Sequence, residues 1–466
     1  MTMKWIKILQ IQDLRKQIAF TLMMLVVCRI GAYIPVPGIN GSEVEKAFHA
    51  IVGGGQNLLQ LLDMFTGGAF AHMTITALGV VPYISASIIM QLLIALIPSM
   101  QRELRESGGQ GRRKLGKRIR FLTLLLALFQ SAFFAKQALY YNHSFPGIIF
   151  HQILDVQIFS VPWLFFLLVM CTMTTGTLFL MWIGEQISEY GIGNGISMII
   201  VLGILISFPS MVGSIFKQLN LDSQDSGQIT FSSLILLLGC FFVIILGTIS
   251  VVQGVRKIPL QYARRGISDF HQLEDAHIPL KVNYAGVIPV IFASSLLMFP
   301  ATLIQFLGKT RENPEGILSK ISSMLLPGSW MYAFIYILLI IFFTYFWTAT
   351  QFHPDQIASD MKKNGAFIPG IRQGKPTEEY LEFCMNRLTF IGGGVLALIA
   401  ILPTLVSKIL SVDYMISHFF GGTSLLILIG VIVDTTKQVV SNVMAVSCDG
   451  FMMKDGSNTL RKSPFF

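Results

Sequence analysis

Charged residues are scarce in this chain of 466 residues: Asp, Glu, Lys and Arg make up 13% of it, about half the usual share. Three of the long uncharged stretches are 74–101, 157–184 and 282–308. A soluble globular body needs more polar surface than this, so the composition excludes one. With 53% hydrophobic residues, the chain instead has the composition of a protein that crosses a membrane many times.

Cysteine and histidine are also sparse, and neither forms a recognisable site. The five cysteines contain no CxxC pair and are odd in number, which argues against a disulfide framework and favours buried thiols. The histidines lie in predicted loops or at segment ends, without HxxH or HExxH spacing. We therefore expect no catalytic residue, no metal site and no cofactor, and a protein that is not an enzyme.

Ten apolar segments are long enough to cross a bilayer, since about 20 helical residues span its hydrocarbon core. Backbone amides in lipid must be hydrogen-bonded within the segment, so such runs become helices rather than loops. The predicted fold is therefore an all-α polytopic membrane protein. The predicted spans are 18–37, 76–97, 119–141, 161–183, 194–215, 233–254, 284–306, 330–350, 388–406 and 421–444.

Basic residues collect in alternate loops. Segments 98–120, 255–283 and 351–387 carry most of the Lys and Arg, whereas the intervening loops carry few. The positive-inside rule then places both termini and these three loops in the cytoplasm. The last two loops are too long for simple connectors, and the Gly and Pro residues of 351–387 predict tight turns and an ordered docking surface.

Residues 57–65 (NLLQLLDMF) form an apolar run that is too short to cross the membrane and lies between two glycine clusters. A run near ten residues is typical of a re-entrant or interfacial segment, and flanking glycines allow it to move as a unit. The residues alone leave two interpretations equally open: a re-entrant segment, or a helix packed rigidly on the outer surface.

Ionisable residues inside the predicted spans are nearly absent. Arg29 lies near the outer end of the first span, and we expect its side chain to snorkel toward the interface. Asp434 lies in the last span with Lys437 one turn further on, and an internal ion pair is favoured over a proton or ion site. Ion-coupled carriers usually have more buried acids, which argues against that class.

Six distinctive motifs extend from the first span to the last: RIGAYIPVPG (29–38), LGVVPYISASIIMQLL (78–93), GEQISEYGIGNGIS (184–197), PLKVNYAGVIPVIFASS (279–295), KKNGAFIPGIRQG (362–374) and FGGTSLLI (420–427). In sequence and order they resemble those of the bacterial SecY family, the central subunit of the Sec protein-conducting channel. The chain departs from the family pattern at Tyr190, where Arg is usual, and at the weakly basic tip 266–269 of loop 255–283.

The resemblance implies two inverted halves of five helices, 1–217 and 231–445, joined by an external linker at 218–230 and followed by a cytosolic tail at 446–466. It also implies a pore between the halves, narrowed by an aliphatic ring that excludes ions by dewetting, and a plug formed by segment 57–73. The ring positions would be Val80, Ile84, Ile196, Ile200, Ile291 and Ile427, and the plug positions Leu58, Leu62, Asp63, Phe65, Gly67 and Gly68.

The resemblance further implies a lateral gate between the second and seventh spans, which would release membrane segments sideways into the lipid bilayer. Cytosolic arginines would dock SecA or the ribosome, whose RNA is a polyanion. The implied function is passage of unfolded secretory proteins across the bacterial plasma (inner) membrane, with SecE-like and SecG-like subunits as partners and SecA ATP hydrolysis or translation as the energy source. The gate positions would be Ser85, Asn283 and Phe299, and the docking positions Arg256, Arg264, Arg265 and Arg372.

Two other classes remain as alternatives. A secondary carrier with inverted repeats would need a substrate site in the middle of the membrane. An insertase or scaffold without a pore would not require aliphatic positions from four helices to converge. The periodicity alone leaves the ring positions open, because Val80 with Ile84 and Ile196 with Ile200 are i,i+4 pairs that would also suit packing or lipid contact.

Overall fold

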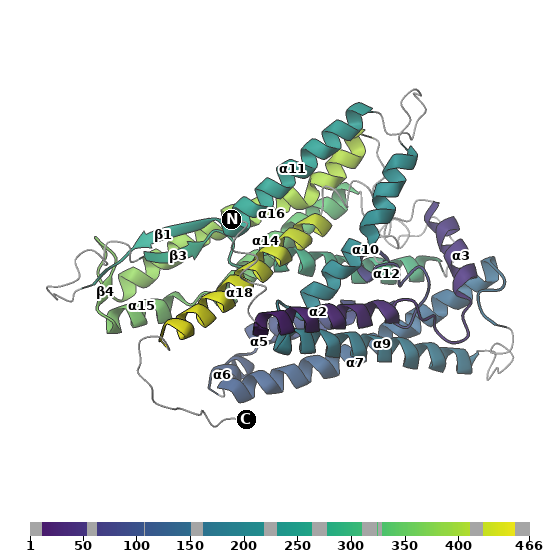
Figure 1. Ribbon diagram of the computed structural model, residues 1–466, viewed down its shortest axis with the longest axis horizontal. Helices are drawn as coiled ribbons and strands as arrows, with labels where there is room; N and C mark the ends of the chain where they lie inside the picture. The colour runs from purple at the N-terminus through teal and green to yellow at the C-terminus, as the bar shows by residue number, and fades with distance from the viewer. Residues whose placement is uncertain are drawn as a thin grey trace.

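A long helix occupies each of the ten predicted spans in the computed structural model (Figure 1). The structure describes residues 12–53, 63–106, 108–150, 162–218, 231–262, 277–309, 324, 329–410 and 423–452. The ten helices are α2 (Gln12–Gly31), α5 (Val81–Leu96), α7 (Gly108–Ser144), α9 (Trp163–Tyr190), α10 (Gly195–Gln218), α11 (Phe231–Gln253), α12 (Ile288–Lys309), α14 (Trp330–Gln351), α16 (Lys375–Leu410) and α18 (Thr423–Met452).

The apolar character of these helices matches a membrane protein. Among the described residues, seven helices are long and apolar enough to span a bilayer, and α5 and α12 contain shorter apolar stretches. Local signals set several helix ends: Pro82 lies in the first turn of α5, and the Ser329 hydroxyl accepts a hydrogen bond from the Met331 amide at the start of α14. The all-α polytopic prediction is confirmed.

Two predicted span boundaries are wrong near the outer end of the first span. The first span was placed at 18–37, but α2 ends at Gly31, because Pro35 and Pro37 restrict the residues before them to extended backbone. Pro35 instead forms an isolated β-bridge with Thr74. The second span begins at Val81 rather than at residue 76, since the chain forms turns up to that point.

The helix α3 (Gly41–Gly53), between the first two spans, was not predicted. Its residues Val44 and Ala47 are buried in an apolar cluster with Phe134 on α7 and Phe165 on α9. The helix is amphipathic and shorter than a membrane span, so hydropathy alone could not reveal it.

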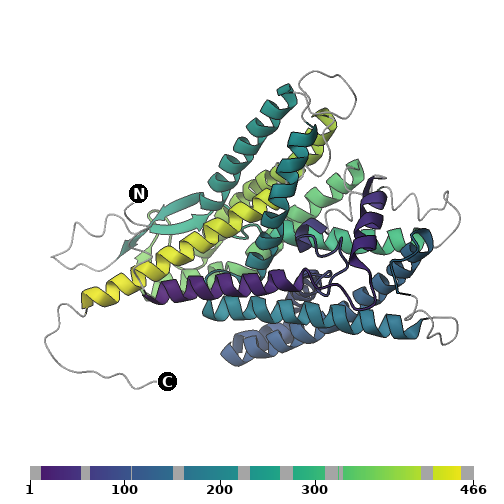
Figure 2. The same cartoon turned by 45° about the vertical axis from the view of Figure 1, so that its right-hand side comes forward.

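The helices form two groups with the same packing pattern. In the first group α5 packs on α7, α7 on α9, and both α2 and α10 on α9 and on each other. In the second group α12 packs on α14, α14 on α16, and both α11 and α18 on α16 and on each other. The five helices of each group thus make equivalent pairs, and the groups lie side by side in two views (Figures 1 and 2).

The two groups meet along two seams, α5 against α12 and α10 against α18. In each group these are the second and fifth helices, so each seam joins equivalent helices of the two groups. The first group crosses the membrane an odd number of times, so the second group begins on the opposite side. Each helix of the second group therefore runs in the opposite direction to its equivalent in the first group. The contact pattern is therefore that of an inverted repeat.

The predicted loops 255–283 and 351–387 form one compact platform rather than separate connectors. Strand β1 (Val255–Pro259) pairs antiparallel with β3 (His277–Lys281), and β2 (Gln261–Tyr262) pairs with β4 (Ala366–Phe367). Segment 351–387 is largely helical, because it contains α15 (Pro354–Lys363) and the first turns of α16. A small core joins both segments; its buried members include Ile258, Leu280, Phe352, Met361, Ile368, Leu381 and Met385.

The predicted tight turns in 351–387 are confirmed. Gly365, Gly370 and Gly374 have φ angles of 67°, 81° and 99°, a region that side chains disfavour. The platform lies at the end of the molecule where α2 begins and α18 ends (Figure 1). Helix α6 (Pro98–Glu106) lies at the same end, where Glu103 pairs with Lys114 and Arg118 of α7 at 3.0 and 3.1 Å.

Candidate functional site

The predicted ring residues all belong to, or pack against, one large apolar cluster that extends through both helix groups. Five of them are between 0% and 8% exposed and belong to the cluster, and Ile196 is half-buried against it. They come from α10, α12, α18 and α5 with the residue before it, so each helix group contributes. The five buried members are Val80, Ile84, Ile200, Ile291 and Ile427.

The predicted ring residues are all aliphatic. On α18 three successive residues, Leu425, Leu426 and Ile427, are all buried. An ion that enters such a region loses its hydration without gaining a polar partner, at a cost of tens of kcal/mol in an idealised apolar medium. The ring residues are thus buried in apolar surroundings, which is the environment that gating by dewetting requires.

The described part of segment 57–73 lies against this cluster. Residues 63–66 are helical, and Met64 is 1% exposed within the same cluster as the ring residues. The Ser424 hydroxyl of α18 donates to Met64 Sδ at 3.6 Å, and Phe65 packs on the cluster. This location favours the re-entrant interpretation over a helix on the outer surface, and Leu58 and Leu62 lie outside the described residues.

A compact turn follows the helical residues. The Asp63 carboxylate accepts a hydrogen bond from the Ala71 amide at 2.7 Å, and the Gly68 amide donates to the Asp63 carbonyl at 3.0 Å. Gly67 and Gly68 have φ angles of 65° and 88°, so glycine at both positions permits the reversal. Asp63, which is unusual in an apolar segment, is thus explained by the backbone amide that it accepts from.

Arg29 has specific partners that were not predicted. Its guanidinium turns inward to the turn just described, where Nη1 donates to the Gly67 carbonyl at 2.6 Å. Nη2 donates to the Tyr33 hydroxyl at 2.8 Å, and the guanidinium carbon lies 4.3 Å from the centre of the Tyr33 ring. Beyond the expected snorkelling, the guanidinium thus has a specific partner, a carbonyl 38 residues away in sequence.

The seam that would form the lateral gate lies between α5 and α12. Helices α5 and α12 pack together, and no hydrogen bond joins them among the residues that the structure describes. Ser85 is half-buried on α5, and buried Asn283 turns back to donate to the Gly286 carbonyl at 2.7 Å. Phe299 belongs to α12, but its side chain lies outside the description.

The opposite seam carries polar contacts. The Gly193 amide, in the turn before α10, donates to the Gln438 side chain of α18 at 2.8 Å. The Thr435 hydroxyl of α18 lies 4.0 Å from Met198 Sδ of α10. Apolar helix faces separate into lipid at low cost because lipid tails are equally apolar, whereas hydrogen bonds resist separation there. Among the described residues, polar contacts therefore join α10 and α18, whereas none joins α5 and α12.

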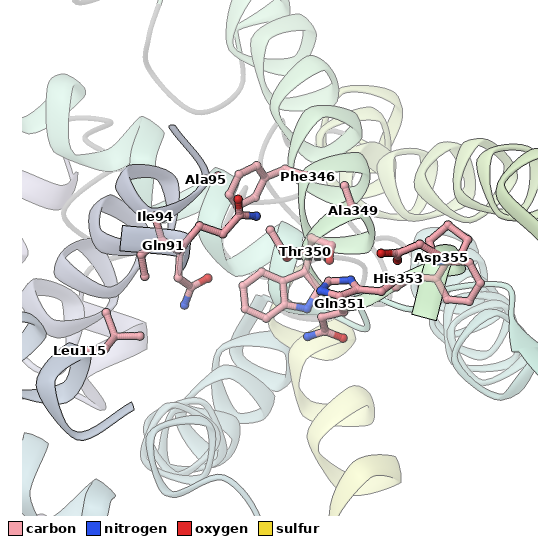
Figure 3. Close-up of a pocket in the computed structure, with 14 residues that line it drawn as sticks. Gln91, Ile94, Ala95, Leu115, Phe346, Ala349, Thr350, Gln351, His353 and Asp355 are labelled. Carbon is pink, nitrogen blue, oxygen red and sulfur yellow. Dashed lines mark hydrogen bonds between the residues drawn. The ribbon is translucent and has the colours of Figure 1, made fainter. Parts of the chain in front are cut away.

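A cavity of about 590 Å³ lies where α5 and α7 of one group face α14 of the other. Gln91, Ile94 and Leu115 line one side, whereas Thr350 and Asp355 lie on the other (Figure 3). Its walls are mainly apolar, with amide, hydroxyl and carboxylate groups around them. The cavity continues the α5–α12 seam toward the end of the molecule that carries α6 and α15.

Two of the four predicted docking arginines lie within the described residues. Arg256 is exposed on β1, and Arg372 is exposed in the turn between Gly370 and Gly374. The Arg372 carbonyl accepts a hydrogen bond from the Thr377 hydroxyl at 2.8 Å, which fixes the backbone of that turn. Both arginines belong to the platform formed by the two segments, whereas Arg264 and Arg265 lie outside the described residues.

Two further sets of charged residues have partners that the sequence did not predict. Lys437 donates to the Val252 carbonyl of α11 at 3.4 Å, and within the described ion pairs it is not matched with Asp434. Glu185 has no basic neighbour in sequence, yet Arg120 of α7 binds it through two contacts of 2.9 and 2.8 Å. This bidentate pair joins α7 to α9 and could not be read from one segment alone.

Fold and site together define a polytopic helical membrane protein with two repeated helix groups and one large apolar cluster that both groups share. A family model described as SecY matches residues 74–436. A protein translocase subunit SecY from Chlamydia trachomatis serovar D is 56% identical over 450 residues, which cover 96% of this chain and 98% of that relative. One from Aquifex aeolicus is 39% identical over 437 residues, or 92% and 94% of the two chains. The chain belongs to the SecY family of protein translocase subunits.

Solved structures agree on the fold. One described as the structure of a protein conducting channel superposes with a TM-score of 0.60 at 19% identity and covers 92% of both chains. Sec61 in a canine ribosome-channel complex superposes with a TM-score of 0.58 at 18% identity and also covers 92% of both. At this level of identity the likeness concerns the fold alone.

Proposed function

We propose that unfolded polypeptides cross the membrane through the constriction between the halves 1–217 and 231–445 of this chain. The observation that carries the proposal is the convergence of aliphatic side chains from four helices of both halves on one buried cluster. An aliphatic ring makes no specific hydrogen bonds, so it accommodates any sequence and closes again without a charged gate. We assign no role in transport to the linker 218–230 or to the tail 446–466.

The seal has two layers in this proposal. The ring of Val80, Ile84, Ile196, Ile200, Ile291 and Ile427 forms the dry constriction, and segment 57–73 acts as a plug. Support for the plug comes from Met64, which is buried against the ring residues, and from the positive φ angles of Gly67 and Gly68. The plug moves aside when a polypeptide enters.

The lateral gate is the α5–α12 seam, with Ser85, Asn283 and Phe299 along it. Support comes from the lack of hydrogen bonds across it in the described residues, set against the hydrogen-bonded α10–α18 seam. The second seam acts as the hinge. Apolar membrane segments leave through the opened seam into lipid, where their backbone groups remain paired as helices.

The platform of 255–283 and 351–387 docks the motor that drives transport. SecA and the ribosome are the partners we propose, with SecE-like and SecG-like subunits in the membrane. Support comes from the exposed Arg256 and Arg372, which stand on one small folded unit. A guanidinium in a rigid turn presents its donors in a fixed direction, which suits acidic protein groups and RNA phosphates.

Replacing Arg372 by Glu should impair transport of a precursor while channel sealing and expression stay at the wild-type level. The reason is that Arg372 is exposed and its turn is held by the Arg372 carbonyl, which the substitution leaves in place. Transport into vesicles driven by SecA measures the effect, and Lys375→Glu, a second exposed position in the same segment, is the matched control. Normal transport by the Arg372 variant would show that this arginine is only a solvated charge.

We further propose that the platform and both termini face the cytoplasm, because the basic segments collect on that side. Single cysteines placed at exposed Ser42 on α3 and exposed Asp360 on α15 should be labelled from opposite sides of the membrane by an impermeant thiol reagent. We expect Ser42→Cys to react from outside in intact cells and Asp360→Cys only after the membrane is opened. The reverse pattern would contradict the orientation.

A further inference from the structure

Arg29 and the segment it binds form a contact that the proposed pore does not itself require. The guanidinium reaches from the outer end of α2 to the Gly67 carbonyl at 2.6 Å. A hydrogen bond from a charged donor is stronger than one between neutral groups. A half-buried arginine at this position therefore has a specific partner in the moving part of the seal.

The Gly67 carbonyl is held in place by close backbone packing. A Cβ on Gly67 would lie 3.0 Å from Gly203 Cα of α10, and a Cβ on Gly203 would lie 2.5 Å from the Phe65 carbonyl oxygen. Segment 65–67 thus rests directly on α10 without intervening side chains. This contact brings the carbonyl within reach of α2 only while the segment is seated.

Arg29 also has a second partner that remains on its own helix end. The Tyr33 hydroxyl accepts from Nη2 at 2.8 Å, and the Tyr33 ring lies beneath the guanidinium. A cavity of about 40 Å³ lined by Arg29, Thr66 and Gly203 lies beside it, and a space of this size admits water. The charge is therefore not left without partners when the segment departs, so the contact is reversible.

We propose that Arg29 is a positioning residue of the seal, a latch that holds segment 63–68 against α10 through the Gly67 carbonyl. The proposal rests on the proposed function, because a latch has an effect only if this segment moves. A single hydrogen bond to a charged group shifts a two-state equilibrium by about ten- to a hundredfold. Loss of the latch thus populates the unseated state without removing the ring.

The test uses the full chain with its co-purifying subunits in vesicles. Arg29→Gln removes the charge, and Arg15→Gln makes the same change at an exposed position on the same helix. Resting ion flux is the first readout. The second is the rate at which an impermeant maleimide labels Phe65→Cys in a chain without its five native cysteines, relative to Ser42→Cys. A purely structural role for Arg29 would lower stability without raising this ratio.

We expect Arg29→Gln to raise the labelling ratio about tenfold while the intact ring keeps resting ion flux low, and Arg15→Gln to leave both readouts unchanged. Tyr33→Phe keeps its aromatic ring and should change them little. Wild-type labelling in Arg29→Gln, measured beside an Ile84→Asn/Ile291→Asn chain that leaks, would overturn the latch and leave the channel standing. No leak from the asparagine chain would overturn the proposed function as well. If Arg29→Gln does not fold, Arg29→Met decides: it keeps an unbranched side chain but has no donor for the Gly67 carbonyl, so labelling must rise, and wild-type labelling contradicts the latch.

Discussion

A chain with both Ile84 and Ile291 replaced by Asn is expected to leak ions at rest. The two side chains are buried in the same apolar cluster and come from opposite halves, so their amides would bring water into the constriction from both sides. Each reduction of about 1.4 kcal/mol in a barrier speeds passage tenfold, and hydration of an apolar constriction removes more than that. We therefore expect flux through reconstituted vesicles to rise by about tenfold or more.

The control for this result keeps the aliphatic character. Ile84→Val with Ile291→Val shortens each side chain by one methyl group but adds no polar atom, so the constriction stays dry. We expect these vesicles to hold an ion gradient as well as the wild-type chain does. A leak from the valine pair equal to that of the asparagine pair would show that tight packing, rather than dryness, makes the seal.

Cysteines at Ser85 and Phe299 should form a disulfide that stops transport. The two residues belong to α5 and α12, which pack together, and a disulfide requires Cα atoms within about 7 Å. With the seam locked, the α10–α18 hinge cannot open the gate, so a signal-bearing precursor stays outside the vesicles. Transport measured before and after reduction tests this, and reduction should restore it.

The opposite seam supplies a matched control for the lock. Met198 and Thr435 lie in contact across α10 and α18, so cysteines there should be bridged by a short bifunctional thiol reagent. Because this seam is the hinge, we expect transport to continue after bridging. Equal inhibition at both seams would place the moving interface elsewhere, and efficient bridging at 85 and 299 without inhibition would show that α5 and α12 touch but do not gate.

The sequence predicted the helices and the charged ends for separable physical reasons. Uncharged runs such as 157–184 must be helical in lipid, and α9 forms there, although it continues beyond the run to Tyr190. Helix α3 was missed because it is short and amphipathic, so hydropathy over a span-length window does not detect it. The proline pair after Gly31 was visible, and it should have ended the first span earlier.

The site was harder to predict from the sequence than the fold was. Periodicity shows that Val80 and Ile84 share one helix face, but it does not say whether that face meets lipid or another helix. The partners of Arg29 and of Glu185 lie 38 and 65 residues away in sequence, and only the three-dimensional structure brings them together. The likeness to SecY motifs supplied the ring positions, and their shared burial in one cluster agrees with it.

Resting ion flux through vesicles that carry asparagine pairs on two faces of the same helices tests the central claim most directly. One chain has Ile84→Asn and Ile291→Asn at the ring; the other has Ile89→Asn and Leu296→Asn, whose side chains are 42% and 39% exposed on the outer faces of α5 and α12. The account predicts a leak from the first chain and a sealed membrane with the second. Sealed vesicles with the first chain, or equal leaks from both, would contradict a dry central constriction.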